Sequence, residues 1–437
     1  MFRIAIFQVD FTPPRGLKVG MSGFKKIIEV RDSLFLRGMV IEDERGKDSR
    51  ILIAALDYCV LAHSAYEQLC DVLADASGTS RKRVVIHCVH QHEAPALNFE
   101  AMRYQPQYNP TDYQWWPQLL AHCEEQVRKT DQFQEAQYVG FAETKVDKFA
   151  SNRRVKGNDG VIHTRWSCCA NLKVRSAPEG LIDPMLRTIA FKNNQDEIIA
   201  GMSFYACHPQ AGTSGEKFSA EAPGNALERL SRRSKNGFQM YLTGAAGNIT
   251  AGKYSLPDNP EKNVSVLGER LYNAIKRNMR NLQWEAAVNL EWSEVSFKFP
   301  FRKFDRDKLH EQLNKDPYEV IAAAQLSTLD CGIEQDYRIC MLKIGSSSIV
   351  FLPGEVFVEY QLFANSQAKA AGNNFVAVAA NCRWDFMYLP LAKNFSEKGG
   401  YETLSTLCDE RIESLIKDSI RSLFHINIKK SEILSTQ

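Results

Sequence analysis

The amino-acid sequence predicts a mixed α/β fold with α+β character, in which large mixed β-sheets are flanked by helices. Strand-like runs rich in β-branched and aromatic residues alternate with segments whose apolar residues recur at three- and four-residue steps. Two of the strand-like runs are separated only by a short turn at Gly345 and are typical of a hairpin. Because a hairpin pairs its strands antiparallel, the sheets cannot be purely parallel.

Eleven segments have the composition of strands, with apolar, β-branched or aromatic residues at most positions. These strands are predicted at residues 2–9, 50–58, 83–89, 136–146, 186–191, 197–207, 238–244, 287–299, 337–344, 347–353 and 375–381. Seven further segments carry apolar residues along one helical face. These helices are predicted at residues 62–76, 112–129, 222–234, 264–280, 305–313, 356–371 and 401–423.

Composition narrows the class of function. With 437 residues, 44% of them hydrophobic, the chain can bury a large core in one large domain or two. The net charge of +2 and the lack of a long basic run argue against nucleic-acid binding, so the expected partner is a small molecule. No apolar run approaches the roughly 18 residues of a membrane span, and the N-terminus lacks a secretion-signal pattern. A cytoplasmic location is expected, with the eleven cysteines reduced and mostly buried.

The segment VVIHCVHQHEAP, residues 84–95, joins an apolar strand to two histidines two positions apart. If the chain stays extended past Cys88, the side chains of His90 and His92 project from one face. Neutral imidazoles placed in this way can bind one metal ion or one polarised substrate oxygen. The alternative is that His87, His90 and His92 are ordinary core or loop histidines.

Three other metal-ligand residue types follow predicted strands: His208, Glu355 and Tyr388. Loops at strand ends converge on the functional crevice of sheet-based enzymes, so these residues can meet the paired histidines although they are distant in sequence. Two imidazoles, a carboxylate and a phenolate suit zinc, with one position left for water. Each residue also has a structural alternative, because His208 can cap a strand, Glu355 can begin a helix and Tyr388 can be a core aromatic.

An aromatic cluster follows the histidines in a polar, proline-containing region. Its members are Tyr104, Tyr108, Tyr113, Trp115 and Trp116. The cluster is either a lid over a ligand or an anchor that fixes an irregular loop to the core.

Motifs in the same order across nearly the whole chain resemble the catalytic domain of the neutral/alkaline ceramidases, zinc-dependent amidases that cleave the N-acyl bond of ceramide. VDFTPPRG, MSGF, LRGMVIED and AALDYC lie before HCVHQHEAP, which stands where the family has THTHSGP. They are followed by SNRRVKGN, GMSFYACHP, FSAEAPGN, TGAAGNITAG, FLPGE and NCRWDFMYLP. The paired-histidine segment and FLPGE, which matches the family's LPGE, are the most specific.

The resemblance implies four zinc ligands, which are His90, His208, Glu355 and Tyr388. It implies that His92 and Arg153 contact the substrate, with Arg153 and His92 stabilising the oxyanion and His92 as the first choice for the general acid. Tyr401 lies near a second family tyrosine that faces the substrate. Asp57 and Glu221 are expected to orient the histidines, because metal-bound imidazoles usually donate their other N–H to a carboxylate.

The activity implied is hydrolysis of a linear N-acyl amide by a metal-activated water, with a small-molecule substrate. Hydrolysis of an ester or lactone, or ligand binding without catalysis, stay open as alternatives. Thr250 replaces a family serine that has a catalytic role, and Glu93 puts a charge at the pocket mouth, where a basic or sugar-like group would suit it. The expected organisation is a single ceramidase-like catalytic domain, residues 1–437, without the family's C-terminal β-sandwich.

Overall fold

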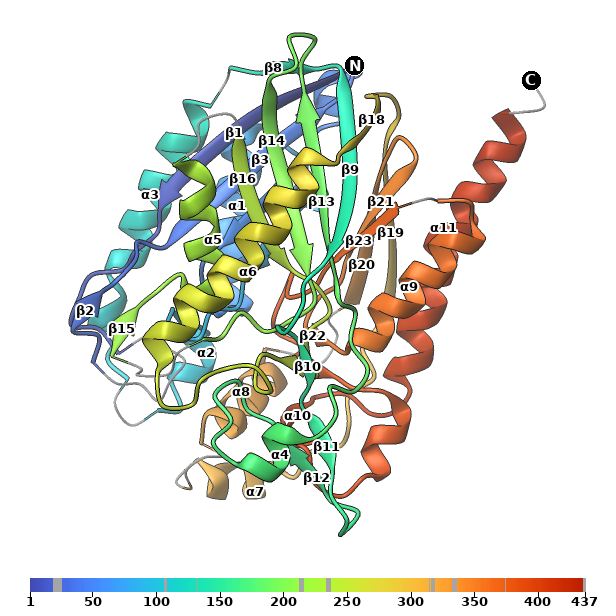
Figure 1. Cartoon of the computed structure of the whole chain (residues 1–437). Coiled ribbons are helices and arrows are strands. Elements are labelled where there is room, and N and C mark those ends of the chain that lie inside the picture. The colour runs from blue at the N-terminus through green and yellow to red at the C-terminus, as the bar shows by residue number, and fades with distance from the viewer. Residues whose placement is uncertain are drawn as a thin grey trace.

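Three large mixed β-sheets with helices packed against them make up the fold (Figure 1). This arrangement confirms the predicted mixed α/β class. The computed structural model describes residues 1–18, 26–105, 108–130, 132–211, 216–232, 237–313, 315, 319–331, 336–373 and 375–434. The MSGF segment of the family resemblance, at residues 21–24, lies outside the described residues.

The first sheet has five strands in the order β6-β4-β3-β1-β8. They span Phe2–Asp10 (β1), Phe35–Glu42 (β3), Ile51–Leu56 (β4), Val84–Cys88 (β6) and Gln134–Ala136 (β8). β1, β3 and β4 are antiparallel neighbours, whereas β4 and β6 are parallel. Helices α1 (His63–Ser77) and α3 (Trp115–Arg128) cover one face and share a buried apolar cluster with it.

The second sheet has the order β16-β14-β13-β9-β18. Its strands span Tyr138–Lys145 (β9), Met185–Lys192 (β13), Ile198–Tyr205 (β14), Phe238–Thr243 (β16) and Gln283–Ala286 (β18). β14 and β16 are parallel, and the other pairs are antiparallel. Helices α5 (Glu221–Ser231) and α6 (Pro260–Arg280) lie across this sheet (Figure 1), because each has an apolar stripe at helical spacing.

The third sheet has four strands in the order β19-β20-β21-β23. They span Leu290–Lys298 (β19), Asp336–Ile344 (β20), Ser347–Phe351 (β21) and Phe375–Ala379 (β23). β20 and β21 form the predicted hairpin, whose turn uses Gly345 at a φ of +57°. Helices α9 (Val358–Ala370) and α11 (Ile412–Leu434) pack beside this sheet (Figure 1).

Each large sheet contains one strand–helix–strand unit with parallel strands: β4-α1-β6, β14-α5-β16 and β21-α9-β23. The carboxyl ends of these strands meet. The N–H of Cys88 donates to the carbonyl of Asn381 at 3.2 Å, and the N–H of Ala380 donates to that of Thr243 at 2.9 Å. The Thr243 hydroxyl in turn donates to the carbonyl of Val89 at 2.7 Å. Loops leaving the three sheets are therefore held at one place, as the strand-end prediction requires.

Short strands and further helices complete the described part of the fold. The strands are Glu29–Val30 (β2), Val60–Leu61 (β5), Ala96–Leu97 (β7), Ser151–Asn152 (β10), Arg154–Lys156 (β11), Ile162–Thr164 (β12), Lys217–Phe218 (β15), Ile249–Thr250 (β17), Glu355–Val356 (β22) and Tyr388–Leu389 (β24). The helices are Phe99–Met102 (α2), Leu172–Ser176 (α4), Arg306–Gln312 (α7), Glu319–Asp330 (α8) and Tyr401–Ser405 (α10). Figure 1 shows α4, α10, β11 and β12 together at one end of the molecule.

Several elements differ from the sequence prediction, and β18, α2 and α4 are among those not predicted. β3 was not predicted, and α8 was missed because it is buried over most of its surface and so lacks an amphipathic pattern. The helix predicted at 401–423 is two helices, α10 and α11. The chain between them is extended at Cys408, which forms a β-bridge with Phe301.

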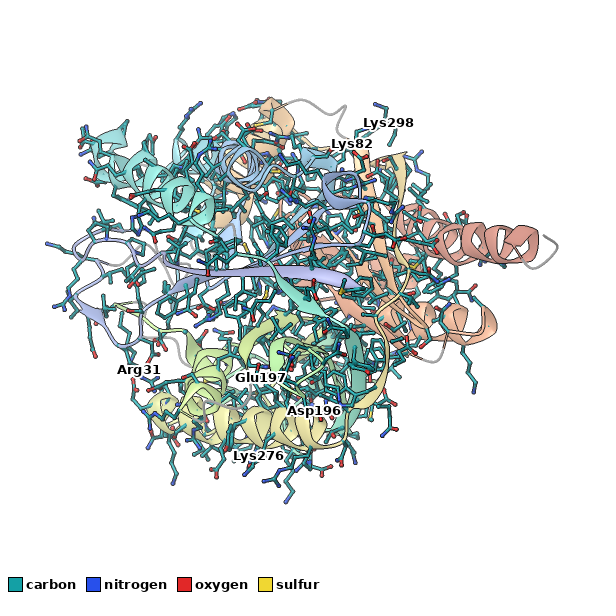
Figure 2. The ribbon with its side chains drawn as sticks, turned by 90° about the horizontal axis from the view of Figure 1, so that it is seen from above. Arg31, Lys82, Asp196, Glu197, Lys276 and Lys298 are labelled. Carbon is teal, nitrogen blue, oxygen red and sulfur yellow. The ribbon has the colours of Figure 1, made fainter. Side chains whose placement is uncertain are left out.

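The structure also bears on the predictions made from composition and from the aromatic cluster. Most cysteines are buried, as predicted. Trp115 and Trp116 belong to the buried cluster under the first sheet, and the indole of Trp116 donates to Gln68 at 2.8 Å, so these two tryptophans anchor the segment to the core. Over the described part of the chain, no helix combines the length and apolarity that a bilayer span requires. Figure 2 labels charged side chains on several elements, with Asp196 and Glu197 together in the turn between β13 and β14: Arg31, Lys82, Asp196, Glu197, Lys276 and Lys298.

Candidate metal centre

Three predicted ligands converge at the junction of the sheets. The Nε2 atoms of His90 and His208 lie 3.3 and 3.2 Å from Oε2 of Glu355. All three side chains are at most 3% exposed, and among the described residues none of these three atoms has a hydrogen-bond partner. Because buried polar atoms without partners are costly, their convergence is typical of a site for a cation.

The backbone conformation that places His90 in the site differs from the sequence prediction. Strand β6 ends at Cys88, and His90 adopts a φ of +74°, so the extended geometry expected past Cys88 is wrong. Its N–H donates to the carbonyl of Tyr58 at 2.9 Å, and Nδ1 donates to the carbonyl of Cys59 at 2.8 Å. With Nδ1 held there, Nε2 faces Glu355.

His208 is oriented in the same way. It follows β14, and its N–H donates to the carbonyl of Ile249 at 3.0 Å. Nδ1 lies 2.8 Å from the carbonyl oxygen of Ala246 and 3.0 Å from that of Ile249. Since both neighbours are acceptors, Nδ1 carries the proton and Nε2 is the candidate ligand atom.

Backbone carbonyls thus orient both histidines, and the expectation that Asp57 does so is wrong. The Asp57 carboxylate accepts hydrogen bonds from Arg37 at 2.7 Å and from the side chain of Gln91 at 2.9 Å. It therefore fixes the loop between His90 and His92. Glu221 accepts from the backbone N–H groups of His92 and Ala211, both at 2.7 Å, and so ties the loops after β6 and β14 together.

Glu355 is placed by the parallel pair of β22 and β24, in which it lies opposite Tyr388. Its Oε1 accepts a hydrogen bond from Nε1 of Trp384 at 2.9 Å, which leaves Oε2 to face the two imidazoles. Burial alone would raise the pKa of this carboxyl group, but His90 and His208 lower it well below its usual value. The group is therefore a carboxylate at neutral pH.

Gly354 forms the turn that directly precedes Glu355. Its φ is +75°, and a Cβ there would lie 2.8 Å from the carbonyl oxygen of Met387. Gly354→Ala is expected to lower the free energy of unfolding by about 3 kcal/mol, because strain and a backbone clash add. Gly372 has the same φ and open space around it, so Gly372→Ala should cost only about 1 kcal/mol. Urea denaturation compares the two variants, and equal losses would contradict the clash.

Trp384 holds the carboxylate in the orientation just described. Trp384→Phe keeps an aromatic ring but removes the donor to Oε1, so the affinity of this candidate site for a divalent metal ion is expected to fall about 10- to 100-fold. Trp116→Phe is the matched control, since it also loses an indole hydrogen bond, to Gln68, away from the site. Competition with a chelator measures both affinities. Unchanged affinity in Trp384→Phe would show that the indole does not position Glu355.

A second group of residues lies beside the ligands. The guanidinium carbon of Arg153 is 4.9 Å from the ring centroid of Tyr388 and 5.8 Å from that of Tyr401. Its Nε donates to Glu402 at 2.7 Å, whereas Nη2 is buried without a hydrogen-bond partner among the described residues. Burial raises the pKa of the Tyr388 phenol well above its usual value, and Arg153 opposes that shift. The structure therefore brings Arg153, Tyr388 and Tyr401 together.

His92 also faces this group, with its ring centroid 5.0 Å from that of His90 and 5.8 Å from that of His208. Burial and the neighbouring histidines hold its pKa well below the usual value, so its imidazole is neutral. Cys59 with His90 and His92 forms a second possible ligand group. Burial raises the pKa of the Cys59 thiol, which makes it a poorer ligand than the Glu355 carboxylate.

Two predicted site residues have other contacts. The Thr250 hydroxyl donates to the carbonyl of Arg165 at 2.9 Å, and Thr250 pairs with Ser151 between β17 and β10, so its catalytic role stays a prediction. Glu93 is buried, and its backbone carbonyl accepts from the N–H of Ser219 at 2.7 Å. A role for the Glu93 carboxylate in substrate binding also stays a prediction.

Sequence reasoning missed three residues that shape the site: Cys59, Trp384 and Glu402. Trp384 is four residues before Tyr388 in the sequence, and Glu402 directly follows Tyr401. Their roles come from contacts with Glu355 and Arg153 that depend on the complete fold. Cys59, within the quoted segment AALDYC, and the carboxylate of Glu402 beside Tyr401 were the signals in the sequence that could have drawn attention.

Comparison with known proteins bears on the fold. No protein-family model and no curated protein sequence matches the chain. The crystal structure of neutral ceramidase from Pseudomonas aeruginosa is similar, with a TM-score of 0.71 and 16% sequence identity, over 97% of this chain and 74% of that chain. A structure described as ceramidase complexed with C2 has a TM-score of 0.69 at 16% identity, over the same shares. The chain therefore has the fold seen in these ceramidase structures, as the motif resemblance implied.

Proposed function

We propose that the chain is a zinc-dependent hydrolase of linear N-acyl amides. The observation that carries the proposal is the convergence of His90, His208 and Glu355 with three buried atoms that lack hydrogen-bond partners among the described residues. Two imidazoles and a carboxylate are a donor set that suits zinc, and Tyr388, opposite Glu355 in the strand pair, is the fourth candidate ligand. The ceramidase fold and the motif resemblance support an amide as the substrate bond.

Zinc bound by these side chains would lower the pKa of a water molecule from ~15.7 towards ~7 and would polarise the substrate carbonyl. Arg153 would donate from Nη2 to the carbonyl oxygen as negative charge develops there, in a buried environment that strengthens the interaction. His92 would take up the proton that the attacking water loses and deliver it to the amine nitrogen as the C–N bond breaks. Glu402 would hold Arg153 in place through Nε.

An amide and an ester with the same acyl group test the proposal. The zinc-supplied protein is expected to hydrolyse the amide, to lose that activity with EDTA and to regain it with zinc. Hydrolysis of the ester but not the amide would show that the substrate bond is an ester. A protein that binds no metal and turns over neither compound would be a non-catalytic ligand-binding relative. The single-domain organisation of residues 1–437 and the cytoplasmic location stay predictions.

A further inference from the structure

Large apolar side chains are exposed at the end of the molecule that carries Tyr401. Among the described residues, eight large hydrophobic side chains are exposed, and four of them lie in or next to the segments around β12, α4 and α10. These four are Trp166, Leu172, Leu181 and Leu404, with exposures of 49%, 73%, 51% and 51%. Figure 1 shows α4, β12 and α10 together at this end. Grouped exposed apolar residues mark a binding surface more often than scattered ones do.

Trp166 connects this surface to the candidate centre through a series of rings. Its ring lies edge-on to Tyr401 with centroids 5.2 Å apart, and Tyr401 lies edge-on to Tyr388 with centroids 5.6 Å apart. Tyr388 is opposite Glu355 in the pair of β22 and β24. The aromatic wall, defined here as Trp166, Tyr401 and Tyr388, therefore runs from solvent to a predicted ligand.

The backbone that carries Trp166 is firmly held. Arg165 is fully buried, and its side chain donates to the carbonyls of Val174, Ala177 and Pro178. Its N–H donates to the carbonyl of Arg153 at 2.7 Å. A half-exposed indole on a rigid support loses little conformational entropy when a ligand covers it, so it is suited to binding.

We propose that Trp166 is a substrate-positioning residue, and that the apolar part of the N-acyl substrate lies along the aromatic wall. The inference rests on the proposed function, because the scissile bond is placed at the centre where the wall ends. The faces and edges of the rings offer a flat apolar surface, so the wall would favour long apolar substituents over short ones.

Amides of one amine with acetyl, hexanoyl and dodecanoyl groups, and a matching series with a lengthened amine, test the proposal. In Trp166→Ala the KM for the longest amide of at least one series is expected to rise about tenfold, with kcat and the KM of the acetyl amide changed less than about twofold. Trp166→Phe should recover most of the loss. Tyr138→Ala, which removes an exposed ring from β9 at a distance from the site, is the control.

Equal KM changes for short and long amides in both series would overturn the role of Trp166. If Trp166→Ala instead weakens binding to phosphatidylcholine vesicles and leaves every KM unchanged, the surface contacts membranes and the proposal fails. If the wild-type protein cleaves no amide, the proposed function fails separately. Calorimetric titration with the uncleaved amides then tests binding along the aromatic wall separately. The longer amides are expected to bind more tightly to wild type than to Trp166→Ala.

Discussion

Glu355→Gln is expected to release zinc from the protein and to lower amide hydrolysis at least about 1,000-fold, since a bound metal supplies several kcal/mol of transition-state stabilisation. The substitution keeps the shape of the side chain but removes the charge that faces the Nε2 atoms of His90 and His208. Wild type supplied with zinc should contain close to one equivalent by elemental analysis. His208→Ala should lose the metal as well, because it removes a second donor atom.

The control for this experiment is Glu228→Gln on α5. Glu228 is exposed and pairs with Arg232 on the same helix, so neither zinc content nor activity should change. Stoichiometric zinc in both Glu355→Gln and His208→Ala would place the metal elsewhere. Absence of zinc from the supplemented wild type would remove the basis of the proposed function.

The secondary structure was largely predictable because most strands and helices have one buried face. Apolar residues therefore recur every 2 residues along a strand and about every 3.6 residues along a helix. The exceptions lack that pattern. β3 is buried along nearly its whole length and contains Gly38, whose place under the ring of Phe7 leaves no room for a Cβ. α8 has eight buried residues among its twelve, so no polar face marks it as a helix.

The candidate ligands were predictable because each follows a strand, and the ends of the parallel strands meet. The backbone conformations that orient these side chains were not predictable from the sequence. His90 has a φ of +74°, and Glu221 and Met387 also have positive φ values near the site. Local sequence preference disfavours such values for these residues, so the surrounding tertiary contacts must impose them. The carbonyls that orient His90 and His208 come from residues whose side chains carry no information about that role.

Arg153→Ala is expected to lower kcat for amide hydrolysis about 100- to 1,000-fold while zinc stays bound, because it removes a buried donor aimed at the developing oxyanion and no ligand. The protein should remain folded. Glu402, the partner of Arg153, keeps a second ion pair with Arg154 in the variant, so its carboxylate is not left buried without a counter-charge.

Arg154→Ala separates catalysis from stability. Arg154 is bonded to the same Glu402 and also to Glu397 at 2.7 Å, and its side chain is nearly as buried as that of Arg153. The two substitutions should therefore cost similar free energies of unfolding, measured by urea denaturation. Only Arg153 approaches the ring of Tyr388, so kcat should fall in Arg153→Ala and change only a few-fold in Arg154→Ala. Equal losses of kcat would mean that both arginines act through Glu402 alone and that neither stabilises the oxyanion.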